Sequence, residues 1–417
     1  MFPNLFLISL AVVALLCVVF EEKIHINKAK TTLFCGTLAW VILFVAAGKN
    51  GSKEVDAALS ENLMEIASLW LFLISAMTFV VYLNRKGMIV NLIYRLLPGR
   101  LTERKLMLLT GLFCFCFSSI CDNITATLCS ITLILSLRLS PEKNVRYAVL
   151  VVFAINSGGV SLITGDVTTL MIFLADRVEI QNLLLLGISS FVGVLVLALL
   201  LSRELEAVVE LNHDYSPTTF VDRVIAVIFL CTIAGSLAAS VLFSIPPVLC
   251  FLFGLSLMFL AASIFQEKLD DDPIMNYIRL IEFDTLLFFL GVLLVVGMLE
   301  EIHVLESVAL LYTGLPPSLA SLVMGLLSAM IDNVPLTAGL LKSGIELNLT
   351  DWLLVTYAVG VGGSLLVIGS AAGIVAMSKV SGLTFSVYLR FLWQLLIAYG
   401  CGFVATLLLG RAVFGGW

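Results

Sequence analysis

Long apolar runs constrain this chain more than any other feature. Stretches of roughly 17–22 apolar residues alternate with short polar breaks, and a helix needs about 20 apolar residues to cross the hydrocarbon core of a bilayer. Hydrophobic residues make up 60% of the chain and charged residues 12%, which is about half the charged share of a soluble domain. The sequence therefore predicts an all-α polytopic membrane protein.

The apolar runs fall at residues 4–20, 31–48, 62–84, 105–139, 145–177, 181–201, 220–243, 245–266, 281–299, 315–345, 351–378 and 386–410. Two of them, 105–139 and 315–345, are too long for one crossing and too short for two, and each has a polar centre. We expect each to form a re-entrant helical hairpin. Runs 145–177 and 351–378 contain the Gly-rich stretches 156–159 and 360–364. These stretches predict crossings interrupted at that point, where irregular backbone lines a wet cavity or is buried in protein.

The remaining composition excludes several classes of protein. The first run is expected to be a retained helix, because it lacks the basic start and the small-residue cleavage site of a signal peptide. The nine cysteines lie in or beside apolar runs without the spacing of metal ligands, so we interpret them as packing residues. No phosphate-binding loop appears. We expect no cofactor and no nucleic-acid partner.

Matching motifs divide the chain into two halves. The matched pairs are Ser118…Asp122-Asn123 with Ser328…Asp332-Asn333, Gly158-Gly159…Gly165-Asp166 with Gly362-Gly363…Gly369-Ser370 and, more weakly, Glu65…Ser68 with Glu282…Thr285. Matches in the same order predict homologous repeats at 1–201 and 220–417, joined by a cytoplasmic linker at 202–219. If a hairpin counts as no crossing, each repeat crosses five times, once as a broken helix. An odd number inverts the second repeat relative to the first.

Basic residues orient the chain. With the N-terminus outside, 18 of the 23 Lys and Arg fall on cytoplasmic faces, including Lys28, and the others are Lys49, Lys53, Arg177, Lys342 and Arg411. An excess of Lys and Arg marks the cytoplasmic side, so both termini are expected outside. The basic segment 85–105 is expected to lie at the membrane interface. Inverted repeats with broken helices at mid-membrane are typical of secondary transporters.

Three aspartates within apolar runs are the candidate functional groups: Asp122, Asp166 and Asp332. A carboxylate at membrane depth costs at least about 2.5–3.5 kcal/mol, so one that is kept there is a functional candidate. Amide and hydroxyl side chains accompany the three aspartates: Asn123, Thr125, Asn156, Ser157, Thr168, Thr169, Asn333, Thr337, Ser364 and Ser370. Such oxygen ligands suit a hard cation, and neither Asp-Asn motif contains a basic residue to hold an anion.

The same carboxylates predict proton exchange. Burial disfavours a charged carboxylate, whereas helix N-termini and hydroxyl donors favour it, so a balanced site holds either a proton or a metal cation. We expect Asp122, Asn123, Asp166, Asp332 and Asn333 to form this shared site, without a basic partner. In the alternative interpretation the Asp-Asn pairs only cap the second half-helices and satisfy the exposed backbone, and Asp166 is a loop residue near the surface. Glu65, Glu282, Asp284 and the three histidines are expected at membrane boundaries and in loops.

Three segments resemble signature segments of NhaD-type sodium/proton antiporters, in the ion transporter superfamily. They are Cys121-Asp122-Asn123-Ile124-Thr125, Gly165-Asp166-Val167-Thr168-Thr169 and Ile331-Asp332-Asn333-Val334-Pro335-Leu336-Thr337. Thr164 departs from the pattern, which has a glycine at this place. The resemblance implies a homodimer in a bacterial inner membrane, with a scaffold and a mobile transport unit in each protomer. The transport unit would hold the hairpins and broken helices, move as an elevator, and exchange sodium or lithium for protons at the motif Asp and Asn residues.

Two other functions fit parts of the pattern. The first is transport of a dicarboxylate or arsenite, as in related carriers of the same superfamily. The dicarboxylate carriers place Ser-Asn-Thr at the hairpin tips, where this chain has Asp-Asn, and the added negative charge would repel an anion. An intramembrane aspartyl protease also uses two buried aspartates. Its Gly-x-Gly-Asp pattern has Ile163 in place of the first glycine here, and duplicated Asp-Asn motifs have no role in such an enzyme. We therefore expect no enzymatic activity.

Overall fold

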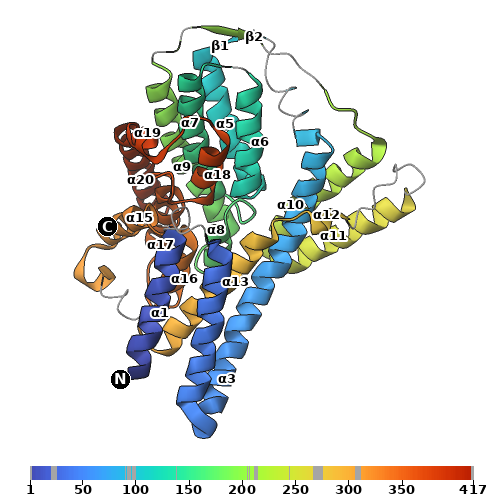
Figure 1. The fold of residues 1–417 in the computed structure, drawn as a ribbon. Helices are drawn as coiled ribbons and strands as arrows, with labels where there is room; N and C mark the ends of the chain where they lie inside the picture. Colours follow the sequence, from blue (N-terminus) through green and yellow to red (C-terminus); the bar gives the residue numbers. More distant parts are fainter. Residues whose placement is uncertain are drawn as a thin grey trace.

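The computed structural model describes residues 2–414 apart from 20–25, 90, 92–94, 96–99, 138, 204, 206, 211–214, 244, 266–275 and 306–310. In the described residues the chain is almost entirely helical (Figure 1), and two short strands, β1 (Arg100–Thr102) and β2 (Val208–Glu210), form an antiparallel pair. Six helical segments of this part are long and apolar enough to span a membrane: Lys28–Gly48, Gly51–Arg85, Ile180–Leu201, Pro247–Ile264, Phe283–Glu301 and Leu392–Phe414. The prediction of a polytopic helical membrane protein is confirmed, with the small strand pair as an addition.

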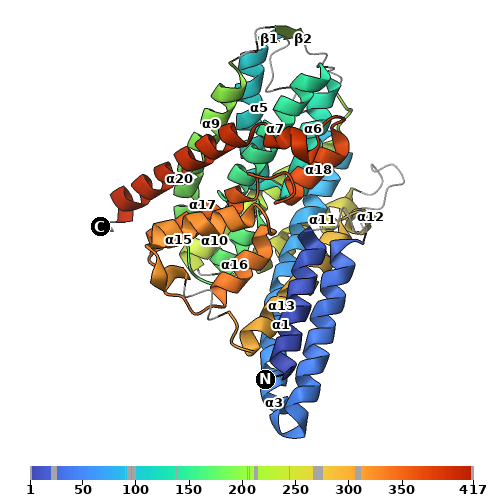
Figure 2. The ribbon, with the colours of Figure 1, turned by 60° about the vertical axis from the view of Figure 1, so that its left-hand side comes forward.

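The helices form two bundles (Figures 1 and 2). The α3 bundle consists of α1 (Phe2–Val19), α3 (Lys28–Arg85), α10 (Phe220–Phe243), α11 (Pro247–Ile264), α12 (Asn276–Arg279) and α13 (Phe283–Glu301). The α7 bundle consists of α5 (Glu103–Ile120), α6 (Asn123–Ser136), α7 (Pro141–Gly159), α8 (Val167–Leu174), α9 (Ile180–Leu201), α15 (Pro317–Ser328), α16 (Asn333–Leu341), α17 (Leu349–Gly362), α18 (Ala371–Lys379), α19 (Phe385–Leu389) and α20 (Leu392–Phe414). The bundles meet mainly where α13 packs on α16 and α3 packs on α6.

A sharp reversal divides α3 into two spans. Gly48 has φ +60° and interrupts the helical backbone between Lys28–Gly48 and Gly51–Arg85. Glycine adopts this conformation without the clash that a Cβ would cause. The reversal forms the lower end of the molecule in Figure 1, and α13 packs along α3. The indole of Trp40 donates a hydrogen bond to the carbonyl of Leu294 at 2.9 Å, which fixes the first span on α13.

Each of the two long apolar runs folds into two helices, as the sequence predicts. The first run gives α5 and α6, which lie beside each other in both views and are separated at residues 121–122. The second run gives α15 and α16, separated at residues 329–332. Runs 145–177 and 351–378 form the broken helices α7–α8 and α17–α18.

The interruptions of the broken helices lie later than the sequence predicts. α7 stays helical through Gly159 and α17 through Gly362, so the irregular segments are 160–166 and 363–370. The glycines before the breaks allow close helix packing instead. A Cβ on Gly158 would lie 2.1 Å from the carbonyl oxygen of Phe115 in α5, and one on Gly362 would lie 2.2 Å from that of Gly325 in α15. A glycine pair in an apolar run thus marks a helix crossing as readily as a helix end.

Two of the connections between the bundles, from α3 to α5 and from α9 to α10, lie at the end of the molecule opposite Gly48. Part of the predicted interfacial segment 85–105 and part of the predicted linker 202–219 fall outside the described residues. The remainder of the two segments supplies β1 and β2, which pair with each other (Figure 1). The guanidinium of Arg104 donates to the carbonyls of Leu205 and Arg203, each at 3.2 Å. Pairing of the two segments closes one end of the α7 bundle.

Candidate functional site

The tip between α5 and α6 carries the first aspartate. Asp122 caps α6, and its Oδ1 accepts a hydrogen bond from the backbone N–H of Thr125 at 3.0 Å. Its Oδ2 is buried and has no hydrogen-bond partner among the described residues. The amide oxygen of the next residue, Asn123, accepts a bond from the hydroxyl of Ser118 at 3.0 Å. One carboxylate oxygen is therefore used for the helix cap and the other is left available to a ligand.

The tip between α15 and α16 repeats this arrangement with a difference. Asp332 caps α16 through the backbone N–H of Val334, at 3.5 Å. The side chain of Asn333 turns toward the α7–α8 break, where its Nδ2 donates to Oδ2 of Asp166 at 3.0 Å. The second tip is thus joined to the broken helix of the first half of the chain, which lies far away in sequence.

The third aspartate lies at the break between α7 and α8. Asp166 caps α8 through the N–H of Thr168 at 3.3 Å, and only 6% of its surface is exposed. Gly159, at the end of α7, leaves space beside it: a Cβ there would lie 2.9 Å from Oδ1 of Asn123 and 3.1 Å from Cβ of Asp166. Asp166 is therefore a buried carboxylate between the two tips, and the interpretation of it as a surface loop residue is wrong.

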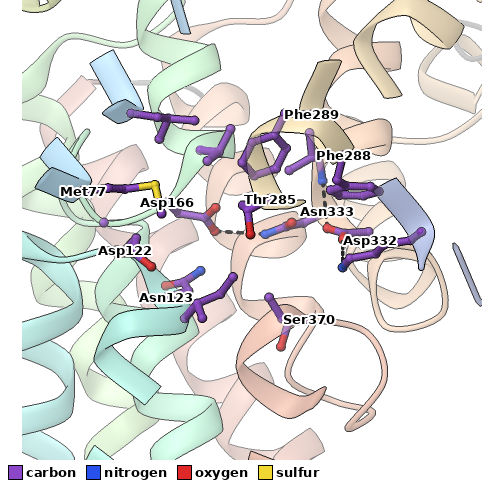
Figure 3. A pocket seen from close by; sticks show the side chains of 17 residues that line it. Met77, Asp122, Asn123, Asp166, Thr285, Phe288, Phe289, Asp332, Asn333 and Ser370 are labelled. Atoms are coloured by element: carbon purple, nitrogen blue, oxygen red, sulfur yellow. Dashed lines mark hydrogen bonds and ion pairs between the residues drawn. The ribbon is translucent and has the colours of Figure 1, made fainter. Parts of the chain in front are cut away.

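A cavity of about 90 Å³ joins these groups (Figure 3). Asp122, Asn123, Asp166, Asp332, Asn333 and Ser370 all line it. The other walls come from the α3 bundle, with Met77 of α3 and Thr285, Phe288 and Phe289 of α13. A volume of this size accommodates a small ion with a few waters. The cavity lies at the interface of the two bundles. Most of its polar groups belong to the α7 bundle, and the α3 bundle contributes mainly apolar side chains besides Lys28 and Thr285.

The five residues predicted to bind a cation and a proton thus surround one cavity, although they do not form a compact ligand cluster. Within the described part of the chain, no three His, Cys, Asp or Glu side chains converge closely enough to hold a metal ion. Asn333 connects two of the aspartates, since it follows Asp332 in sequence and donates a hydrogen bond to Asp166. The carboxylates are therefore distributed around the cavity, and the amide of Asn333 links Asp166 to the second tip.

The expectation that the aspartates have no basic partner is wrong for Asp332. The ammonium of Lys28, the first residue of α3, lies 3.5 Å from its Oδ2. Lys28 also lies over the ring of Phe288, 4.5 Å from the centroid, and lines the cavity. The sequence places Lys28 only on a membrane face. Its approach to the second tip depends on the packing of α3 on α13 and of α13 on α16.

The hydroxyl and amide residues predicted to support the site mostly lie behind the cavity wall. The amide nitrogen of Asn156 donates to Oγ of Ser370 at 3.1 Å, which joins α7 to the cap of α18. Thr337 bonds the carbonyl of Asn333 at 3.0 Å. Four others, Thr125, Ser157, Thr168 and Thr169, lie within four residues of a cavity residue or of the α7–α8 break. Ser364 lies in the α17–α18 break, and its hydroxyl donates to the carbonyl of Val361 at the end of α17. The hydroxyls of Ser157 and Thr168 are buried without a partner in the described residues.

The cavity residues of the α3 bundle are not among the residues that the sequence predicts for the site. Thr285 appears in the weakest repeat match, which was the one indication in the sequence that this residue belongs to the site. Met77, Phe288 and Phe289 resemble any apolar residue of a membrane helix. Glu65, Glu282 and Asp284 do not line the cavity; Asp284 accepts a hydrogen bond from the amide of Asn27 at 2.8 Å. Of the three histidines, only His303 lies within the described residues.

Broken helices that meet around a buried polar cavity at the junction of two bundles define a membrane transporter. The model of the citrate transporter family matches residues 5–360 of the chain. Proteins named Na⁺/H⁺ antiporter NhaD are similar over nearly the whole length. The one from Alkalimonas amylolytica is 31% identical over 98% of this chain and 91% of its own length, and the one from Vibrio cholerae is 32% identical over 96% and 91%. Sodium/proton antiporter 1 of Arabidopsis thaliana is 28% identical over 89% of this chain and 68% of its own length.

The chain belongs to the family of NhaD-type sodium/proton antiporters, which confirms the resemblance of its three motifs. These relatives are transporters, so they point away from an enzyme such as an aspartyl protease.

Proposed function

We propose that the protein exchanges sodium for protons across the membrane, with Asp166 as the group that carries either ion. The observation that supports this most is the position of Asp166. It is a buried carboxylate in a small cavity, it accepts a hydrogen bond from Asn333, and it lies beside Asn123. A proton neutralises Asp166 directly, and a sodium ion does so by coordination to its oxygens. Only one of the two is needed at a time, so binding one releases the other.

The charge of the cavity supports a cation rather than an anion as the substrate. Three carboxylates face the cavity and Lys28 supplies one ammonium, so the ionised cavity is negative. Oδ2 of Asp122 is a further acceptor, with no hydrogen-bond donor among the residues that the structure describes. A citrate-like anion would face repulsion that grows at low dielectric. We therefore propose sodium, with lithium as a second substrate, although the matching family model carries the name of citrate.

Paired local contacts support two inverted repeats, 1–201 and 220–417. The hydroxyl of Ser118 donates to the carbonyl of Ile155 at 2.8 Å, and that of Ser328 donates to the carbonyl of Val359 at 2.7 Å. Each bond ties the end of a first hairpin helix to the following broken helix. In addition, α6 packs on α18 and α8 packs on α16, so the second half-helices exchange partners between the repeats, as a two-fold relation requires.

The two bundles suggest the moving parts. We propose that the α3 bundle is the scaffold and forms a homodimer, and that the α7 bundle is the transport unit and moves against it as an elevator. The cavity supports this division because its ion-binding groups lie mainly on one bundle. We further propose that the end with β1 and β2 faces the cytoplasm of a bacterial cell, with both termini outside. Arg100 lies in β1, Arg104 in the first turn of α5, and Lys143 pairs with Glu103 in that turn, and basic residues mark the cytoplasmic side.

Everted membrane vesicles with an internal acid gradient test the proposal. Addition of sodium or lithium should dissipate the gradient, whereas citrate should not. Asp166→Asn should abolish the sodium response because the amide keeps the size of the side chain but cannot exchange a proton. Asp176→Asn is the matched control: Asp176 is exposed beyond the end of α8 and has φ +54°, which asparagine also tolerates. A full response in Asp166→Asn, with comparable protein in the membrane, would contradict the assignment.

A further inference from the structure

Lys28 occupies a place that its own helix does not favour. It is the first residue of α3, where the helix dipole and the unpaired N–H groups favour negative charge rather than positive. About one-fifth of its side chain is exposed, at 19%, and Asp332 is exposed by 12%. Groups from elsewhere in the fold favour its ammonium at this position, among them the carboxylate of Asp332 and the ring of Phe288. Figure 3 shows these two side chains beside each other at one end of the cavity.

The start of α3 is held firmly in the α3 bundle. Asn27 caps α3 by accepting a bond from the N–H of Ala29 at 2.8 Å, and its amide nitrogen donates to Asp284 at the start of α13, also at 2.8 Å. One side chain thus joins the first turns of two helices of the scaffold. Lys28 follows directly in sequence, so its ammonium is presented to the cavity from the scaffold side.

Asp332, in contrast, belongs to the α7 bundle and is coupled to the candidate ion site. It caps α16, and its neighbour Asn333 bonds Asp166. The ion pair with Lys28 therefore crosses the interface between the two bundles, one residue away from the amide that contacts the exchanging carboxylate. A cation that enters the cavity is attracted to Asp332 and repelled by Lys28.

We propose that Lys28 is an internal counter-ion, which pairs with Asp332 while the cavity holds no sodium and releases it when sodium enters. The inference rests on the proposed function, because it assigns the ion cavity to sodium. Release of Asp332 removes an electrostatic contact between scaffold and transport unit. Occupancy of the cavity is thereby coupled to the freedom of the two bundles to move relative to each other.

Chemical modification of the intact protein tests the release directly. Purified protein is treated with an amine-acetylating reagent in sodium chloride or choline chloride, and acetylation of Lys28 is measured by mass spectrometry relative to Lys30, which is exposed two residues further along α3. Sodium should raise the Lys28 to Lys30 ratio by about threefold, the size expected of a partly exposed ion pair. In Asp332→Asn the ratio should already be high in choline, and sodium should not change it. A wild-type ratio that sodium leaves unchanged, at any level, overturns the inference.

Transport gives a second, independent readout. Lys28→Gln should lower the sodium concentration for half-maximal exchange by about fivefold, because a competing cation is removed. In an Asp332→Asn background the same substitution should have a clearly smaller effect, as a double-mutant cycle requires of a pair that acts together. Lys30→Gln is the matched control and should behave as the wild type. If Lys28→Gln shifts sodium dependence equally in both backgrounds, the pairing is wrong.

The outcomes separate the two proposals. Wild-type vesicles that fail to exchange sodium for protons refute the proposed function, whatever the labelling shows. Wild-type vesicles that exchange normally, together with a labelling ratio that does not respond to sodium, refute only the role of Lys28.

Discussion

Replacing Asn333 by alanine tests whether the second tip acts on Asp166. In the structure, Nδ2 of Asn333 donates to Oδ2 of Asp166 at 3.0 Å. Both residues are almost completely buried, with exposed fractions of 5% and 6%, so water does not readily replace the lost donor. The protonated acid has less need of this donor than the charged carboxylate does. Loss of the amide should therefore favour a proton over sodium at Asp166.

The size of the effect follows from the kind of bond that is lost. A hydrogen bond to a charged group contributes about 1.5–3 kcal/mol when the site is buried. At about 1.4 kcal/mol for each tenfold change, Asn333→Ala should raise the sodium concentration for half-maximal exchange by roughly 10- to 100-fold. The maximal rate at saturating sodium should change less, because Asp166 itself remains.

Sodium titration of the pH-gradient response in everted vesicles measures this shift, with the amount of inserted protein determined in parallel. Asn348→Ala provides the matched control, since it removes the same kind of side chain from the start of another helix. Asn348 caps α17 by accepting a bond from the N–H of Asp351 at 2.9 Å. The control should lower thermal stability by about 1 kcal/mol without changing sodium dependence. A half-maximal concentration within twofold of the wild type in Asn333→Ala would refute the assignment of this bond to the ion site.

Two further substitutions test the packing around the site and the stability of the α7 bundle. Gly159→Ala places a methyl group 2.9 Å from the amide oxygen of Asn123. It should reduce exchange in vesicles at least about tenfold by displacing that side chain. Gly400→Ala is the control and should have no effect, because its added carbon meets nothing within 4 Å. Lys143→Met removes the partner of Glu103, whose side chain is only 2% exposed, and should lower the free energy of unfolding in detergent by about 1–3 kcal/mol. Adding Glu103→Gln should recover part of the loss. If Lys143→Met alone melts like the wild type, this account is contradicted.

The class of protein could be predicted from the sequence because it depends on one physical requirement. A helix in lipid satisfies its own backbone hydrogen bonds and needs an apolar surface of fixed length. Both properties are visible as runs of residues, and so are the polar interruptions around Asp122 and Asp332. The caps that these two aspartates form are local as well, since each accepts from an N–H group two or three residues ahead. Capping was the alternative interpretation of both residues, and the structure gives them this role together with a place in the cavity.

The exact site of each helix break was less predictable. Glycine permits both an irregular backbone and a close helix crossing. At Gly158 and Gly362 the second use holds, because backbone carbonyls of α5 and α15 occupy the space that a side chain would take. Sequence spacing alone does not separate the two uses.

By itself the sequence determined the membrane-spanning class, the broken helices and the acidic residues placed at their ends, because each of these follows from local composition or from contacts within a few residues. The tertiary structure alone decided that Asn333 bonds Asp166, which lies 167 positions away in sequence, and that Lys28 pairs with Asp332 across 304 positions. These contacts depend on how two bundles pack against each other. Which helices pack against each other does not follow from the spacing of residues along the chain. A periodic sequence pattern therefore does not predict these contacts.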